Sequence, residues 1–150
     1  MDTGQSPEQH SGGNDGGAES ASRPAVDLMH RLGQVNEADA NIFEWGSIQG
    51  LCSGDLFADA QQTFGYVRIL PGQKNPQHYH PNSDEMLLLL EGELHHSLDD
   101  QSFHLRPGMS IHIPQGVLHD ARNQGEVTAH MIVAYPTNDR RVVMNEEGQE

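Results

Sequence analysis

From Phe43 onward the chain consists of short β-prone segments, each bounded by residues that favour turns. Pro71-Gly72, Pro107-Gly108 and Pro114-Gln115-Gly116 are such boundaries, and the last of them fits a type I turn. No long helical pattern follows residue 40. Short strands separated in this way are typical of an all-β sandwich or barrel. We therefore expect strands at Trp45–Leu51, Thr63–Leu70, Gln77–His80, Glu85–Leu90, Glu93–Leu98, Phe103–Leu105, Ser110–Ile113, Val117–Ala121 and Val127–Tyr135.

Two other segments carry a clear pattern. The longest uninterrupted apolar stretch, Met86 to Leu90, is apolar on both faces of a strand, which predicts burial on both sides. This stretch is far too short to cross a bilayer. The segment from Val26 to Leu32 places apolar residues on one face of a short helical turn, which we expect to end at Gly33.

The start of the chain has a different composition. The segment from Met1 to Ala25 contains almost no large apolar side chains and is rich in Gly, Ser, Asp, Glu and Gln. Such a segment buries too little surface to offset the entropy that it loses on ordering. We therefore predict a disordered tail over residues 1–25 and a single domain over residues 26–150, which is long enough for one hydrophobic core.

The charge balance limits the classes of partner. Acidic residues outnumber basic residues by 22 to 8, giving a formal net charge of −14. A surface of this charge repels phosphate backbones and anionic lipid head groups, so we expect neither nucleic acid nor a membrane as partner. The single cysteine, Cys52, cannot form an internal disulfide, and the N-terminal residues show no secretory pattern. These features predict a cytoplasmic protein.

Four residues have the spacing of a metal site. His78 and His80 are two positions apart, which on a strand places both imidazoles on one face. A turn then returns the chain to Glu85, and a second turn precedes His119. Three imidazoles and one carboxylate suit a divalent first-row ion such as Fe, Mn, Ni, Cu or Zn.

The same residues form two patterns that resemble the sequence motifs of the cupin superfamily. The first, Gly-x5-His-x-His-x4-Glu-x6-Gly, is filled by Gly72, His78, His80, Glu85 and Gly92. The second, Gly-x5-Pro-x-Gly-x2-His-x3-Asn, is filled by Gly108, Pro114, Gly116, His119 and Asn123. The resemblance covers about residues 63–135.

The resemblance implies a double-stranded antiparallel β-helix, the jelly roll or cupin barrel. It also implies one divalent transition metal in the mouth of the barrel, with His78, His80, Glu85 and His119 as ligands. Cupins commonly pair through an N-terminal strand, so the resemblance further implies a homodimer, in which Trp45–Leu51 would pair the two copies.

Candidate substrate contacts lie close to these ligands in the sequence. Asn75 precedes the first histidine in a stretch similar to germin-type cupins, where the matching asparagine contacts the substrate; the alternative is a turn-forming Asn before Pro76. Tyr66 and Arg68 alternate on one predicted strand and so share a face. If that face points inward, Arg68 would bind a carboxylate substrate; if outward, it would pair with surface acids. Trp45 is interpreted as a core or interface residue.

The resemblance leaves three classes of function open. The first is a metal-dependent dioxygenase or oxidase acting on a small chelating substrate, with Glu85 as the catalytic residue that takes part in proton transfer. The second is a non-redox lyase or isomerase of a small carboxylate or sugar acid. The third, least favoured, is a small-molecule-binding sensor module. His95, His96 and His104 lie in a polar hairpin, where we expect them to be solvated.

Overall fold

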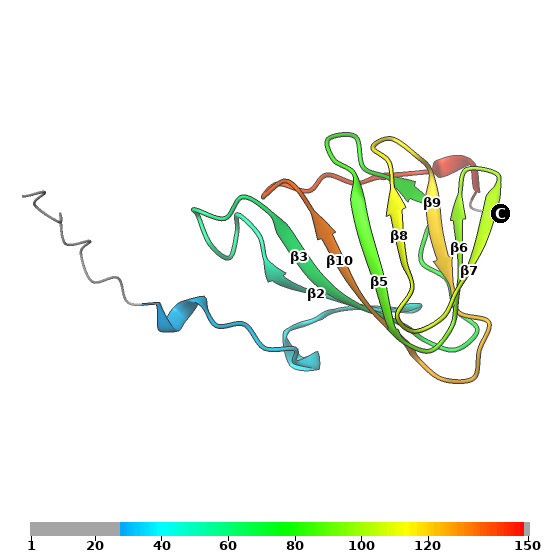
Figure 1. Cartoon of the computed structure of the whole chain (residues 1–150), viewed down its shortest axis with the longest axis horizontal. Helices are drawn as coiled ribbons and strands as arrows, with labels where there is room; N and C mark the ends of the chain where they lie inside the picture. Colours follow the sequence, from blue (N-terminus) through cyan, green and yellow to red (C-terminus); the bar gives the residue numbers. More distant parts are fainter. Residues whose placement is uncertain (1–27, 149–150) are drawn as a thin grey trace, which may run out of the picture.

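The computed structural model describes residues 28–148, and within that range it contains two antiparallel sheets and three short 3₁₀ turns. The two sheets face one another as an all-β jelly roll (Figure 1), which confirms the expected fold. The predicted tail over residues 1–25 lies outside the described residues. Among the described residues, no helix has the length and apolar character needed to span a membrane.

The larger sheet has the strand order β1-β2-β3-β10-β5-β8, and the smaller sheet has the order β11-β4-β9-β6-β7. Strands that are far apart in the sequence are therefore neighbours, as in the pairing of β10 with both β3 and β5. The strands run over β1 Asn41–Phe43, β2 Gly46–Cys52, β3 Thr63–Ile69, β4 His78–Tyr79, β5 Glu85–Glu91, β6 Leu94–Leu98, β7 Gln101–Leu105, β8 Ser110–Ile113, β9 His119–Arg122, β10 Ala129–Tyr135 and β11 Val143–Met144.

Each strand predicted from the sequence overlaps one of these, with ends that differ by a few residues. The pattern did not predict β1 or β11, because both are very short and are defined only by their partners β2 and β4. The expected helical turn is a 3₁₀ turn at Met29–Arg31, and two more 3₁₀ turns lie at Glu37–Asp39 and Glu146–Gly148. The first two residues of the predicted turn, 26 and 27, lie outside the described residues.

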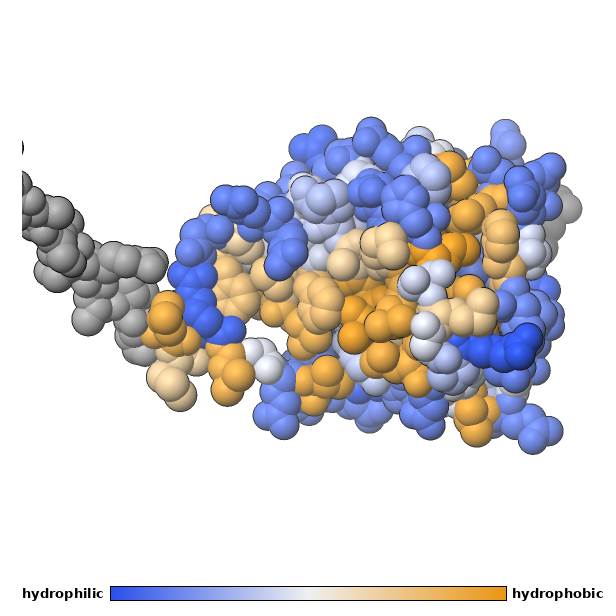
Figure 2. Space-filling view, viewed as in Figure 1, coloured by the Kyte–Doolittle hydropathy of each residue, from blue (hydrophilic) through white to orange (hydrophobic). Residues whose placement is uncertain are grey.

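The core lies between the sheets and is made by alternate residues of each strand. On β5, Leu87 and Leu89 are buried, but Met86, Leu88 and Leu90 are 43%, 37% and 42% exposed. The prediction that this strand is buried on both sides is therefore wrong for the single chain. The reason is that the smaller sheet covers only one face of the larger one. Figure 2 shows apolar side chains gathered over the region of β10 and β5.

A buried asparagine ties together the loops at one end of the barrel. The Asn123 side chain is fully buried, and its Nδ2 donates hydrogen bonds to the carbonyl oxygens of Ile69 at 2.9 Å and Val127 at 2.8 Å. Its Oδ1 accepts a hydrogen bond from the Gly125 amide at 2.9 Å. The backbone of Asn123 also bonds to the loop after β3, so one residue joins three segments.

Replacing Asn123 with Asp should destabilise the fold by about 2–4 kcal/mol, because a carboxylate cannot donate to the two carbonyl oxygens and leaves them unsatisfied in a buried place. Urea denaturation followed by circular dichroism would measure the loss. The control is Gln124→Asp, which adds the same charge at an exposed neighbour. Equal stability of the two variants would contradict the structural role of Asn123.

Candidate metal centre

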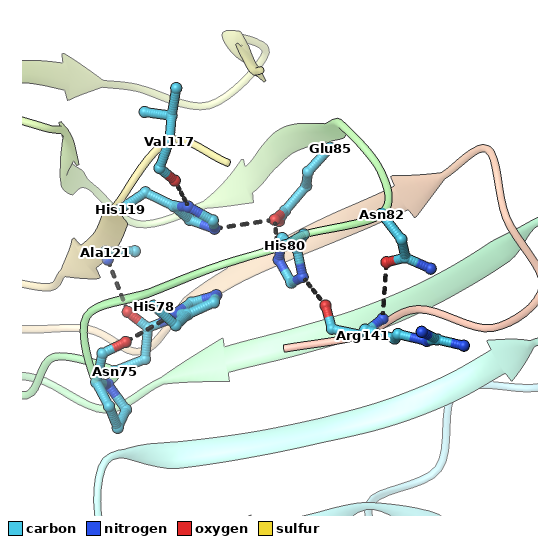
Figure 3. A network of polar contacts seen from close by, with 10 residues as sticks. Asn75, His78, His80, Asn82, Glu85, Val117, His119, Ala121 and Arg141 are labelled. Carbon is cyan, nitrogen blue, oxygen red and sulfur yellow. Dashed lines mark hydrogen bonds and ion pairs between the residues drawn. The ribbon is translucent and has the colours of Figure 1, made fainter. Parts of the chain in front are cut away.

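The four predicted ligands come from both sheets and meet inside the barrel. His78 begins β4 and is paired in register with His119, the first residue of β9. His80 follows β4 directly, and Glu85 is the first residue of β5 in the opposite sheet. One donor atom from each of the four lies within 4.8 Å of all the others. Figure 3 shows the side chains pointing toward one another.

The turns before Glu85 and His119 are joined to each other. The Gly116 amide donates a hydrogen bond to the carbonyl oxygen of His80 at 3.0 Å, and Val117 closes its own turn by donating to Pro114 at 3.2 Å. Gly116 has a φ of +80°, a backbone conformation that residues other than glycine rarely adopt. This turn sets the entry of His119 into β9.

Backbone carbonyl groups orient all three imidazoles (Figure 3). The Nδ1 atom of His78 lies 2.7 Å from the Pro76 carbonyl oxygen. His80 Nδ1 lies 2.7 Å from Arg141 O, and His119 Nδ1 lies 2.8 Å from Val117 O. A carbonyl oxygen only accepts hydrogen bonds, so each Nδ1 carries the proton. Each Nε2 then has a free lone pair, which is the arrangement found in metal-binding histidines.

The centre of the site fits a cation. The Nε2 atoms of His80 and His119 lie 3.0 and 3.1 Å from Glu85 Oε2. With the proton on Nδ1, a neutral ring has nothing to donate at these short distances, so lone pairs would face a carboxylate. A divalent ion bound by the four donors removes that conflict. All three residues are at most 4% exposed, so water cannot easily solvate the charge.

Burial and mutual contacts set the protonation states. Burial, followed by the charge of nearby His119, lowers the pKa of His78 to about 4. Burial alone would raise the pKa of Glu85, but its close contacts with His119 and His80 outweigh burial and hold that pKa well below its usual range. A neutral His78 and an ionised Glu85 are the forms that bind a metal.

The donor set opens on a mainly apolar cavity of about 220 Å³, which we call the metal cavity. Aromatic rings form one wall, where Phe43 and Trp45 stack with ring centroids 5.0 Å apart and planes 4° apart. Trp45, the only tryptophan of the chain, was expected in the core or an interface; it is partly buried and packs against the core, and it also lines this cavity. The aliphatic walls are Ile48, Val67, Leu87, Ala121, Met131, Val133, Val142 and Met144.

The three predicted substrate contacts lie in different places. Asn75 lines the metal cavity, and its Oδ1 accepts a hydrogen bond from the Ala121 amide at 2.7 Å. Tyr66 and Arg68 lie on the opposite face of β3 from the cavity-lining Val67, so the structure does not bring them to the metal centre.

Contacts on the outer face hold Tyr66 and Arg68. The Tyr66 hydroxyl hydrogen-bonds to His130 Nδ1 at 2.9 Å, and the Arg68 guanidinium lies 4.7 Å from the centre of the Tyr66 ring. Arg68 Nε is 3.5 Å from a carboxylate oxygen of Glu37. This pairing with an acid is the second of the two arrangements that the sequence left open.

His96 is a cavity residue that the sequence pattern did not identify. It is 1% exposed, lines the metal cavity and stacks on His119 with ring centroids 5.8 Å apart. The prediction that it is solvated is wrong, because alternation on β6 places it on the same inward face as the buried Leu94. Its Nδ1 has no hydrogen-bond partner among the described residues, and burial lowers its pKa to about 4.

Tyr135 is the second unpredicted residue beside the ligands. Its ring lies 4.9 Å from the His80 ring and is 5% exposed. Burial, together with the negative charge of Glu85, raises the pKa of Tyr135 well above its usual value. The residue therefore presents a neutral hydroxyl at the wall of the cavity. Period-2 alternation on β10, with Met131 and Val133 inward, was the signal that could have placed it there.

The other histidines between residues 28 and 148 are outside this site. His112 is exposed and lies 2.7 Å from Asp84, while His95 and His104 stack on the outer side of the smaller sheet. Within residues 28–148, the only group of three or more histidine, cysteine or acidic donors close enough to share an ion is the set around Glu85.

Replacing His119 with Ala should weaken metal binding at least roughly tenfold, because the remaining donors no longer surround the ion. Elemental analysis of purified protein and titration with zinc would measure the change. The control is His112→Ala, which removes an exposed imidazole on the outer face of β8 that is not one of the four donors. Full metal content and unchanged affinity in the His119 variant would contradict the four-ligand assignment.

Comparisons with known proteins agree with this geometry. A family profile described as the cupin domain matches residues 65–135. Polyketide synthase CurC of Streptomyces cyaneus is 30% identical over 105 residues, which are 70% of this chain and 68% of that protein. Oxalate oxidase 1 of Hordeum vulgare is 33% identical over 85 residues, 51% of this chain and 42% of that protein.

The fold is similar to that of a solved oxalate oxidase structure. Oxalate oxidase in complex with the substrate analogue glycolate superposes with a TM-score of 0.67 and 21% identity, covering 83% of this chain and 67% of the other. That identity is low, so the likeness describes the fold alone. The jelly roll, the two filled motifs and the matched relatives together lead to one conclusion: the chain belongs to the cupin family.

Proposed function

We propose that this cupin is a metal-dependent enzyme that acts on a small chelating substrate, and that the reaction is an oxidation by dioxygen. The observation that carries the proposal is the donor set itself, which has three oriented imidazoles and one carboxylate at the wall of an apolar cavity. We propose His78, His80, Glu85 and His119 as the ligands. A bound iron or manganese ion would supply Lewis acidity and the capacity to activate dioxygen.

In this proposal the residues that line the cavity exclude water and orient the substrate. The aliphatic and aromatic walls exclude water and favour a flat, largely apolar molecule. His96, Asn75 and Tyr135 are neutral polar groups on these walls that could orient substrate oxygen atoms by hydrogen bonds. Glu85 supplies the negative charge of the donor set, and we propose it as the catalytic residue that accepts a proton from a bound hydroxyl group.

The lining of the metal cavity favours a reaction that needs few protein side chains to donate or accept protons. Among the residues that the structure describes, no serine or cysteine lines the metal cavity, and Glu85 is the only carboxylate there. Oxalate oxidase 1 is an oxidase by name, and the name of polyketide synthase CurC makes polyketide-like substrates candidates for testing. The lining and the first of these names support an oxidation of an enol or diol. The cytoplasmic location and the single domain over residues 26–150 stay predictions.

Iron-loaded or manganese-loaded protein should consume dioxygen when supplied with small enols, catechols or 2-oxo acids, and Glu85→Ala should lose at least about 99% of that rate, because it loses both ligand and charge. An oxygen electrode would measure the rate, with His112→Ala as the control. If a true substrate turns over equally well without oxygen, the oxidase proposal fails and the lyase or isomerase class replaces it. Tight binding without turnover would favour the sensor module.

We also propose that the chain forms a homodimer through the outer face of the larger sheet. Met86, Leu88 and Leu90 form an exposed apolar row on β5, and Leu28 and Leu32 in the segment before β1 are 62% and 81% exposed. Exposed apolar residues gathered in this way often mark an interface. The same chain carries both surfaces, so a second copy is the occupant that fits both.

Native protein should sediment at about twice the mass of one chain at micromolar concentration, and Leu88→Glu should raise the dimer dissociation constant at least roughly tenfold, because it buries an unpaired charge in the interface. Analytical ultracentrifugation would measure both. The control is Val127→Glu, an exposed apolar residue in the loop before β10. Monomeric native protein, or equal effects of the two variants, would overturn the proposal.

A further inference from the structure

Arg140 lies where two cavities meet. It lines the metal cavity, and it also lines a second cavity of about 480 Å³, which we call the outer cavity. The two cavities share the lining residues Ile48, Val67, Val133, Tyr135 and Arg140, so they are adjacent. The outer cavity is the more polar of the two, because its walls include four neutral polar residues and two acidic ones, Asp55 and Asp139. Asp139 is paired with Arg141. The neutral polar residues are Asn41, Ser53, Thr63 and Asn138.

Arg140 is one of four basic residues between 28 and 148, with Lys74, Arg106 and Arg122, that have no carboxylate within 4.0 Å. Arg31 and Arg141 each contact a carboxylate within 4.0 Å, as does the Arg68 described above. Arg140 forms no such pair with any residue between 28 and 148, and its guanidinium instead lies 5.3 Å from the centre of the Tyr135 ring. Of residues 28–148, no other lysine or arginine lines either cavity. A half-buried cation without a counter-ion is a binding group for an anion.

The backbone on both sides of Arg140 is held in place. Asn82 donates from Nδ2 to the Asp139 carbonyl oxygen at 2.7 Å, and its Oδ1 accepts from the Arg141 amide at 3.2 Å. Figure 3 shows the second of these bonds beside the donor set. The Arg141 carbonyl in turn orients His80. Arg140 is therefore fixed one residue from a group that positions a metal ligand, and this rigidity lowers the entropic cost of binding.

We propose that Arg140 is the anion-recognition residue of the substrate site. Its guanidinium binds a carboxylate, or another anionic oxygen group, at one end of a substrate whose chelating oxygens face the donor set at the other end. The middle of such a substrate contacts the apolar and aromatic walls of the metal cavity. This inference rests on the proposed function and narrows its substrate class to elongated anions with a chelating end.

A matched pair of ligands tests the charge alone. 3,4-Dihydroxybenzoate has a chelating diol and a distal carboxylate, whereas 3,4-dihydroxybenzamide has the same shape and chelating diol without the charge. The protein is loaded with zinc, which is redox-inert, and elemental analysis first checks that native protein, Arg140→Gln, Arg140→Lys and Arg106→Gln hold equal zinc. Arg106 lines neither cavity and serves as the control for loss of one positive charge. Calorimetry measures binding.

Arg140→Gln should bind the benzoate roughly 10- to 100-fold more weakly than native protein, the range expected for a lost charge-assisted hydrogen bond. For Arg140→Gln, the dissociation constant of the benzamide should change less than threefold. Arg106→Gln should bind both ligands as native protein does, and Arg140→Lys should recover part of the lost affinity for the benzoate. Equal weakening of both ligands, or none, overturns the proposal. If native zinc-loaded protein binds the benzamide but shows no preference for the benzoate, the anion inference fails while the chelating site of the proposed function stands. Absence of zinc would instead contradict the proposed function.

Discussion

Each histidine of the candidate metal centre donates its Nδ1 proton to a backbone carbonyl, and the usefulness of the site depends on these three hydrogen bonds. Two of them are local, because His78 and His119 each bond to the residue two positions earlier. The third joins His80 to Arg141, which is 61 positions away. Without these bonds the rings could rotate or take the other tautomer, and the Nε2 lone pairs would not point at one centre. The jelly roll thus also positions the three backbone carbonyl groups that orient the histidines.

This dependence explains why the ligands were predictable and their surroundings were not. Ligand spacing is a local property, since a two-residue period and two turns bring His78, His80, Glu85 and His119 into the pattern without knowledge of the rest of the fold. Strand positions follow from the same alternation and turn residues. By contrast, Arg140 lies in the loop after β10, whose backbone is hydrogen-bonded to Asn82, far away in the sequence. No sequence pattern encodes that contact.

The sequence predicted poorly which face of each strand points into the barrel, and the errors have one physical cause. Alternation shows which residues share a face but does not show which face points inward. Tyr66 and Arg68 do share a face, yet Val67 is the residue of β3 that points to the metal cavity. His96 is the opposite case, a polar residue on the inward face of a strand that appeared solvated. For β5 the apolar run suggested two buried faces, whereas the single chain covers only one.

Chemistry and selectivity are assigned to different parts of the chain. The metal donors all lie between His78 and His119, within the segment that the cupin profile covers. Under the proposals made above, groups that distinguish one ligand from another lie outside that segment, namely the stacked rings of Phe43 and Trp45 and the Arg140 guanidinium. Since function is set by the site grafted on a fold rather than by the fold itself, relatives that share the donor set can differ in substrate without altering it. Changes at the strand edges and in the loop after β10 would be enough, because those segments touch the cavity while leaving the donors, their carbonyl partners and the core between the sheets in place.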